Sequence, residues 1–259
     1  MEENLSKLVD YSSPGDEQYI IVSGSSSRLY TRYEPSMEFL SSNAGYEIAL
    51  YRLETYYSFP NIVSSNNSIR ISIDNGKSWL DLKIPIGAYD IKGINEALQR
   101  LLPSKSNDGK GNEPYVVLSG NKNTQKCVLD IRKDSTIVDF TAKNSIRSVL
   151  GFQAKKYKGV KRYESENNVN ILSVNSILVH CDVINPVRVN GVFASVFYNF
   201  FPNVSPGEKI VSQPKHLIYV PLTMSVISSM TAWVTDQNYN LLDLRGEELR
   251  ITFHIRKSR

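Results

Sequence analysis

Short apolar runs that alternate with polar residues restrict the fold of this chain most strongly. In Ile69–Asp74 and Leu249–Ile255, apolar residues occupy every second position, the spacing that places one face of a β-strand in a core and the other in water. Clusters of Asn, Gly, Pro and Ser separate these runs, and nothing alternates as strand, helix and strand. The pattern predicts an all-β antiparallel sandwich or jelly roll and disfavours a parallel nucleotide-binding sheet.

About eleven strands are expected. Their ranges are Tyr46–Tyr57, Ile69–Asp74, Trp79–Ile84, Tyr115–Leu118, Cys127–Ile131, Thr136–Phe140, Asn170–Val183, Val192–Phe200, Leu217–Val220, Val226–Thr235 and Leu249–Ile255. The 15 Tyr and nine Phe fit this interpretation, because aromatic side chains suit pleated, half-buried surfaces. Asn75-Gly76, between two of these strands, predicts a tight type I′ hairpin turn.

Helix is scarce. Ile91–Leu102 repeats apolar residues at helical spacing before Pro103, and a second short helical turn is expected over Asn144–Leu150, ending at Gly151. The segment 1–45 holds seven acids against three bases and has Ser- and Gly-rich stretches, which predicts a flexible N-terminal arm that is mobile or ordered by a partner. Residues 46–259 are then one jelly-roll domain, with a sub-boundary conceivable near the polar segment 155–168.

Charge and apolar content exclude several classes of protein. A net charge of +4 is too small for a typical nucleic-acid binder. No apolar run approaches the roughly 18 residues of a membrane span, and the acidic start Met1-Glu2-Glu3 lacks a secretory signal. Cys127 and Cys181 each lie in an apolar run, so buried free thiols are favoured over a disulfide.

Motifs that would support catalysis are missing, and no cofactor is expected. Phosphate-binding glycine loops, nucleophile elbows and zinc helices are all absent from the sequence. His180 and Cys181 are neighbours in a strand, so their side chains should point to opposite faces, one packed and one toward solvent or a partner. The acids Asp236, Asp243, Glu247 and Glu248 resemble a calcium loop only loosely, and a polar hairpin turn accounts for them better.

Two segments could meet a partner. Lys155, Lys156, Lys158, Lys161 and Arg162 lie within eight residues, interleaved with Tyr157 and Tyr163. A solvated loop is the simplest interpretation, and single-stranded nucleic acid, a nuclear-import patch or an acidic partner surface are the alternatives. Arg245, Gly246 and Glu247 predict a tight structural turn before the last strand, with unusual backbone angles at Gly246.

Several pieces in order along the chain resemble one protein family. They are Leu53–Ile62, Ile84–Ile91 with Ile94-Asn95, Asn144–Ile146 leading to Leu150–Phe152, Val174–Val179, Pro202–Gly207 and Leu242–Glu247. Together they resemble the minor capsid, or penton, proteins of Polinton/Maverick elements and adintoviruses, over about residues 46–255. The resemblance implies a jelly-roll subunit at the fivefold vertices of an icosahedral shell. At 259 residues, little room is expected for an added spike domain.

The resemblance also implies partners and a place. They are a homo-oligomer, most simply a homopentamer, and the major capsid protein of the same element or virus. The protein would reside in the virion capsid after synthesis in the host cytoplasm, with assembly that could be nuclear. Nucleic-acid contact is only weakly indicated. The alternative function is a viral attachment or carbohydrate-binding β-sandwich, and an enzyme is the least supported class.

Overall fold

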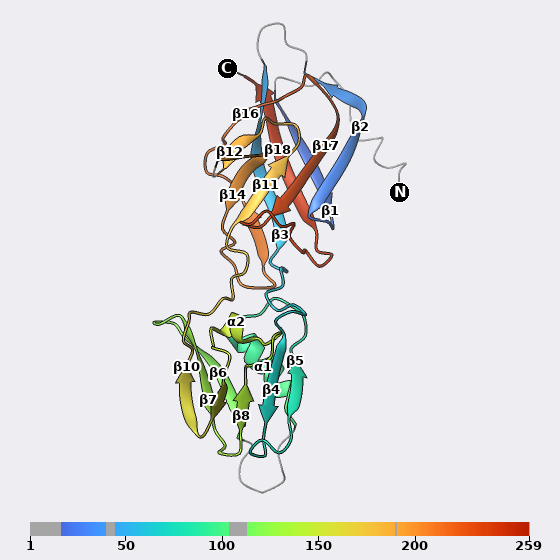
Figure 1. Ribbon diagram of the computed structural model, residues 1–259. Coiled ribbons are helices and arrows are strands. Elements are labelled where there is room, and N and C mark those ends of the chain that lie inside the picture. The colour runs from blue at the N-terminus through green and yellow to red at the C-terminus, as the bar shows by residue number, and fades with distance from the viewer. Residues whose placement is uncertain (1–16, 40–44, 104–112, 190, 259) are drawn as a thin grey trace. The chain divides into compact units, whose positions relative to one another are not determined.

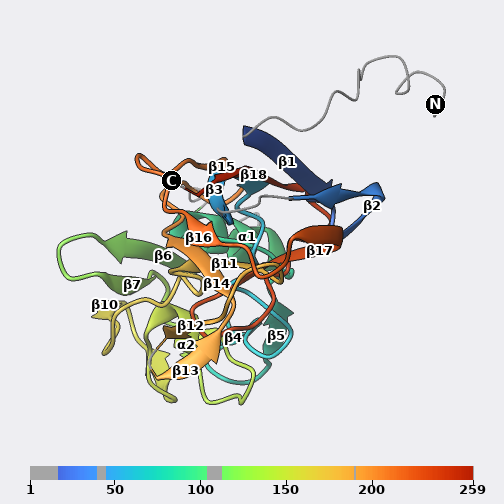
Figure 2. The ribbon, with the colours of Figure 1, turned by 90° about the horizontal axis from the view of Figure 1, so that it is seen from above.

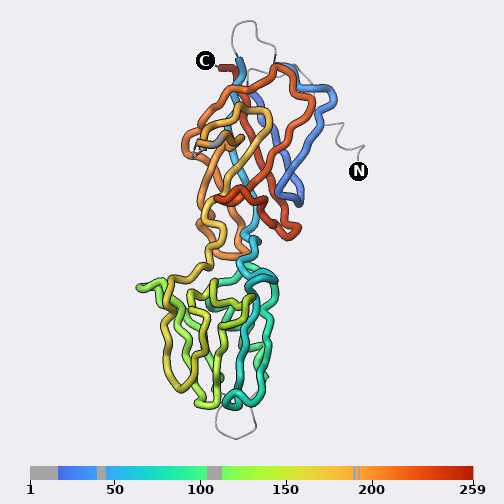
Figure 3. Tube along the Cα trace, in the orientation of Figure 1, coloured from blue at the N-terminus to red at the C-terminus, as the bar shows by residue number. Residues whose placement is uncertain are grey.

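The chain folds into two compact units, and the computed structural model describes residues 17–39, 45–103, 113–189 and 191–258. The described residues up to Tyr57, together with those from Val174 onward, form one unit, here called the discontinuous unit. Ser58–Ser173 form the other, the inserted unit. The tube in Figure 3 follows the chain out of the first unit, through the second and back.

The discontinuous unit consists of two antiparallel sheets and a small hairpin (Figure 1). Its strands are β1 (Glu17–Gly24), β2 (Arg28–Glu38), β3 (Tyr46–Tyr56), β11 (Ile177–Cys181), β12 (Val187–Val189), β13 (Val192–Ala194), β14 (Val196–Phe200), β15 (Lys209–Ser212), β16 (Val220–Pro221), β17 (Val226–Thr235) and β18 (Leu249–Lys257). The first sheet has the order β1-β18-β3-β15, with β16 also paired to β3, and the second has the order β14-β11-β17-β2. The hairpin is β12-β13.

The strand order identifies the discontinuous unit as a jelly roll. Strands from the start of the chain lie beside strands from its end, β1 against β18 in one sheet and β2 against β17 in the other. Between them the chain passes from β3 in the first sheet to β11 and β14 in the second, and returns to β15 in the first. Eight strands wrapped in this way form two facing four-stranded sheets, which is the jelly-roll arrangement. The predicted fold class is confirmed.

The core of the jelly roll lies between the facing sheets. Leu249, Ile251, Phe253 and Ile255 of β18 are at most 1% exposed, so the predicted inward face of the last strand is confirmed. Phe253 meets Phe197 of β14, in the opposite sheet, edge to face at a ring distance of 5.5 Å. Alternating apolar residues on both sheets thus close one shared core.

Part of the segment expected to be an arm belongs to this core. Residues 17–24 and 28–38 form β1 and β2, and Ile20, Val22 and Leu29 are buried. Residues 1–16 and 40–44 of the expected arm lie outside the described residues. Because β1 pairs with β18, more than two hundred residues later, the local Ser- and Gly-rich composition could not reveal this partner.

The inserted unit has two sheets and two helices. Its elements are β4 (Ser68–Ser72), β5 (Leu80–Lys83), α1 (Ile91–Leu101), β6 (Val116–Asn121), β7 (Lys126–Ile131), β8 (Ile137–Asp139), α2 (Arg147–Leu150), β9 (Lys156–Lys158) and β10 (Lys161–Glu164). The sheets are ordered β5-β4-β8-β9 and β10-β7-β6. The sequence predicts one domain over residues 46–259 with a sub-boundary near 155–168, whereas the units divide after Tyr57 and after Ser173.

Helix α1 begins and ends close to where the sequence predicted. Asp90 caps it by accepting a hydrogen bond from the Gly93 N–H at 2.6 Å. Its apolar face buries Ile94, Ala97 and Leu98 in the core of the inserted unit. Side-chain amides on α1 also hydrogen-bond the backbone of β6, since Asn95 accepts from the Leu118 N–H at 2.9 Å. The helix thereby packs into the unit's core beside β6.

The turn before β18 has the backbone angles that the sequence indicated. Arg245 and Gly246 have φ values of 53° and 83°, and the Glu247 N–H donates to the Leu244 carbonyl at 2.9 Å. Positive φ at both central residues defines a type I′ turn. No heavy atom lies within 4 Å of where a Gly246 Cβ would stand, so any cost of a side chain there is conformational.

Gly246→Ala should therefore lower the free energy of unfolding by about 1 kcal/mol, since alanine at this φ is strained and the turn sets the start of β18. Urea unfolding of the whole chain measures the effect. Glu247→Ala, next to it on the exposed side of the turn, is the matched control and should change stability by less than about 0.5 kcal/mol. Equal stability of the Gly246→Ala and wild-type proteins would contradict the assignment of this turn as a structural pivot.

Candidate functional site

The basic segment lies in the inserted unit and is not a simple solvated loop. Lys156 and Lys158 belong to β9, which pairs with β8, whereas Lys161 and Arg162 belong to β10, which pairs with β7. These strands are in different sheets. The chain crosses from one sheet to the other at Gly159, which has a φ of 84°. The five cations are thus held on regular strands or next to them.

Carboxylates compensate most of the charge of this segment. The nitrogen–oxygen distances are 2.6 Å for Lys155–Glu166, 3.7 Å for Lys156–Asp139 and 3.3 Å for Arg162–Asp130. Lys158 and Lys161 form no ion pair with the part of the chain that the structure describes. The local field is consequently weaker than the count of basic residues suggests, and a partner-facing role of the segment stays a prediction.

The two tyrosines of the segment pack inward. Tyr157 is 2% exposed and lies edge to face against Phe152, with ring centres 5.2 Å apart. Its hydroxyl is 3.0 Å from both carboxylate oxygens of Glu166. Tyr163 is half-buried against Tyr157 at 5.1 Å. This packing corrects the view that both rings could stack on nucleic-acid bases, because Tyr157 presents no open face.

A row of alternating charges, which the sequence alone does not predict, crosses one sheet of the inserted unit. The strand register pairs Asp81 with Arg70, Arg70 with Asp139, and Asp139 with Lys156. Opposite charges on directly opposed cross-strand residues stabilise a sheet. The alternation in Ile69–Asp74 already placed Arg70 on the polar face, but its partners come from three other strands.

Trp79 lies over this charged row. The Arg70 guanidinium and the Lys156 ammonium are each 4.9 Å from the centre of its ring. A tryptophan ring attracts cations through its negative face, so the half-buried Trp79 is held by charge rather than by the core. Lys156 therefore has two partners, Asp139 and Trp79, and both are within the protein.

Asp139 is the buried member of the row, at 2% exposure. Burial by itself raises the pKa of its carboxyl group, but hydrogen bonds from the Thr141 hydroxyl and N–H, and the charges of Lys156 and Arg70, outweigh burial. The pKa of Asp139 thus lies below its ordinary value of 3.8. The ionised carboxylate belongs to the folded state.

His180 and Cys181 do not form a nucleophile pair. Both are buried, which differs from the expectation that one of them faces solvent or a partner. The His180 ring stacks on Trp233 at 5.0 Å, its Nε2 is 2.8 Å from the Thr235 hydroxyl, and burial lowers its pKa to about 4. Burial raises the pKa of the Cys181 thiol to about 12. A protonated thiol is a poor nucleophile. Cys127 and Cys181 are both free and buried, as expected.

The acidic segment after β17 is a polar turn. The Asp236 carboxylate accepts hydrogen bonds from the N–H groups of Asn238 and Asn240 at 2.8 and 2.9 Å. Within the described ranges, no group of three or more His, Cys, Asp or Glu side chains could hold a metal ion. No helix in those ranges is long and apolar enough to cross a membrane.

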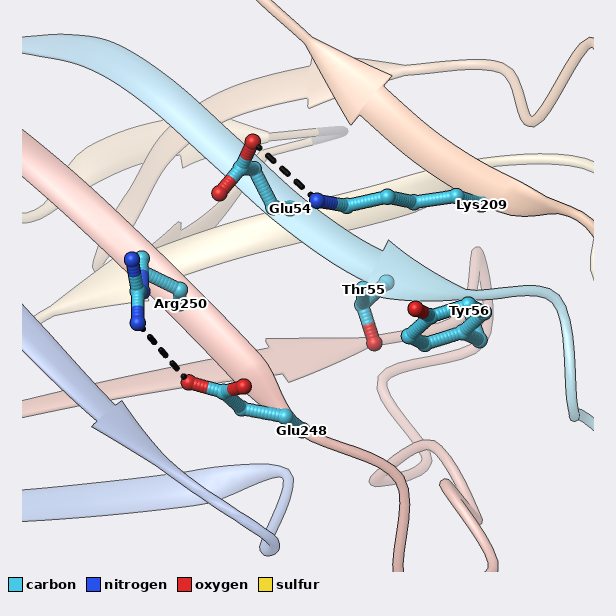
Figure 4. A pocket seen from close by; sticks show the side chains of 6 residues that line it. All are labelled: Glu54, Thr55, Tyr56, Lys209, Glu248 and Arg250. Atoms are coloured by element: carbon cyan, nitrogen blue, oxygen red, sulfur yellow. Dashed lines mark hydrogen bonds and ion pairs between the residues drawn. The ribbon is translucent and has the colours of Figure 1, made fainter.

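A small depression on the first sheet of the discontinuous unit also fails as a ligand pocket. Its volume is about 140 Å³, below the roughly 300–1,000 Å³ of typical small-molecule sites. Figure 4 shows its charged side chains paired with each other, Glu54 with Lys209 and Glu248 with Arg250. The remaining lining residues are Thr55 and Tyr56.

Asp139→Asn should destabilise the inserted unit by about 1–3 kcal/mol near neutral pH, because the amide cannot balance Arg70 and Lys156. A carboxylate with a lowered folded-state pKa contributes stability above pH 3.8, and this contribution is lost as the pH falls through the folded-state value. The difference between variant and wild type should therefore shrink in acid. Urea unfolding at pH 7 and near pH 3 tests it, with Asp81→Asn, at the exposed end of the row, as the control. An unchanged difference at both pH values would contradict the charged role of Asp139.

Comparisons with known proteins identify a solved structure with a similar fold. No family model matches the chain, and no curated protein matches it. Among solved structures, the crystal structure of selenomethionine-labelled mavirus penton protein is similar, with a TM-score of 0.52 and 9% sequence identity. The similarity covers 93% of this chain and 100% of that chain, so it includes residues of both units. The chain shares the fold of a viral penton capsid protein.

Proposed function

We propose that this protein is a structural capsid subunit, a penton or minor capsid protein that closes the fivefold vertices of an icosahedral shell. The observation that carries the proposal is the likeness to the mavirus penton protein over 93% of the chain, on a jelly roll with the strand order found above. The ordered sequence pieces that resemble Polinton/Maverick and adintovirus penton proteins point to the same function independently of the fold.

The protein acts in this proposal through surfaces and not through turnover. Its two thiols are buried, and its most buried histidine is stacked and neutral at physiological pH. The carboxylates of the basic segment and of the charged row are engaged with cations. A capsid subunit needs stable, rigid faces, and paired charges on well-formed sheets supply them. We therefore propose a non-enzymatic role.

The partners follow from this role. The protein would form a homopentamer, contact the major capsid protein of the same virus or element, and reside in the virion capsid. Lys158 and Lys161, the cations of the basic segment without an ion pair in the described residues, are the groups of that segment best suited to meet an acidic partner surface or nucleic acid.

An attachment or carbohydrate-binding role has less support. Such a module offers open aromatic faces to a sugar. Trp79 is flanked by Arg70 and Lys156, while Trp233 lies between Arg28, 5.2 Å from its ring centre, and the stacked His180. Both rings are thus engaged with cations of the protein itself.

The purified wild-type protein should form a discrete cyclic oligomer, most simply a pentamer, in native mass spectrometry. Co-expression with the major capsid protein should place it in assembled shells, because a vertex protein needs both its own copies and the surrounding shell. The fraction of oligomer should rise with concentration, as mass action requires. A protein that stays monomeric at high concentration and is absent from purified shells would contradict the proposal.

A further inference from the structure

We propose that two opposite edges of the jelly roll bind each other in neighbouring copies of this chain. The first edge is presented by Tyr19, Ile21 and Tyr30, and the second edge by Phe193, Phe201 and Ile218. The inference rests on the proposed function, since it assigns the contact surfaces of the capsid ring. The occupant of each edge is therefore a second copy of the same chain.

The first edge carries large apolar side chains that the unit itself does not cover. Tyr19, Ile21 and Tyr30 are 58%, 60% and 67% exposed. Tyr19 and Ile21 alternate with buried Ile20 and Val22, so they stand on the outer face of β1. Strands β1 and β2 are the outermost strands of their sheets and contact each other. Tyr30 follows buried Leu29 in β2, so it lies on the outer face of the second sheet. The three side chains therefore flank the edge of the sandwich at which β1 and β2 meet.

The second edge is equally apolar. Phe193, Phe201 and Ile218 are 63%, 70% and 67% exposed. Phe193 belongs to β13, which directly precedes β14, and Phe201 directly follows β14. Ile218 lies just before β16, which pairs with β3 on the side away from β18. Phe193 and Phe201 thus lie before and after β14, the outermost strand of the second sheet. Ile218 lies on the β15–β16 side of the first sheet.

The sheet orders place the two edges on opposite sides. In the first sheet, β18 and β3 separate β1 from β15, and in the second, β17 and β11 separate β2 from β14. Figure 1 shows β1 and β2 at one side of the unit and β12 and β14 at the other, and Figure 2 separates them in the same way from above. Two different patches on opposite sides of one body associate head to tail, which closes into a ring when the rotation fits.

Charge favours the same pairing. Residues 17–38, which include the first edge, hold the acids Glu17, Glu34 and Glu38 and two arginines. Residues 187–220, which include the second edge, hold Arg188, Lys209 and Lys215 and one acid. Lys209 pairs with Glu54 and adds little to the second edge, which leaves one net negative charge on the first segment and one net positive charge on the second. Opposite charges at the rims of an interface favour the correct encounter and disfavour contact between identical edges.

The test uses one variant at each edge of the full chain. Ile21→Asp disables the first edge, Phe201→Asp disables the second, and Leu241→Asp is the matched control, at a residue 53% exposed in the turn after β17. All three sites are exposed, so thermal melts should match those of the wild type. Sedimentation velocity should show rings for the wild type and the control. Each edge variant alone should be monomeric, with association weakened roughly tenfold or more.

Mixing the two edge variants gives the decisive result. Each retains one intact edge, so an equimolar mixture should form dimers and no rings. If both edge variants still form rings of the wild-type size, the edge assignment is overturned and the proposed function is left standing. Edge variants that remain monomeric when mixed would likewise overturn the pairing of these two edges. A wild-type protein that is monomeric both alone and with shell proteins would instead overturn the proposed function and this inference together.

Discussion

The hydrogen bonding of β18 to both β1 and β3 is the interaction on which the rest of the structure depends. The last strand pairs with the first described strand on one side and with β3 on the other. Its four inward residues are almost completely buried. This pairing joins the two ends of the described chain across the sheet, and the jelly roll cannot close without it. A contact of such long sequence separation is costly in chain entropy, which the shared apolar core must offset.

The inserted unit interrupts the jelly roll between β3 and β11 and leaves the pairing of β18 with β1 and β3 intact. The chain leaves after β3 and returns before β11, and the excursion has its own core around α1 and the aromatic residues Phe140, Phe152 and Tyr157. A polar contact closes one end of this unit. The Asn61 amide donates to the carbonyls of Tyr89 and Ile171 and accepts from the Tyr89 N–H. A buried amide with three partners specifies one arrangement of these segments.

Local chemistry made parts of this fold predictable. The alternation in Leu249–Ile255 identified both the strand and its inward face. The apolar spacing before Pro103 located α1 to within a residue. Asn75-Gly76 has the predicted positive φ values of 60° and 87°. The paired strands end at Ile71 and Leu80, however, so this turn lies in a longer connection and not in the tight hairpin that was predicted. The division into units, the roles of β1 and β2 and the charged row around Asp139 were not predictable in this way, because each depends on partners from distant segments. The basic segment illustrates the limit, since the sequence shows five cations but not the carboxylates that face them.

We propose that the jelly roll is the assembling part of the molecule and that its two edges are the contacts between copies. Electron cryo-microscopy of the purified wild-type oligomer tests this claim most directly. The account predicts a fivefold ring in which β1 and β2 of one copy face the β13–β16 region of the next. A ring whose copies touch only through their inserted units, or a contact between two identical edges, would contradict it.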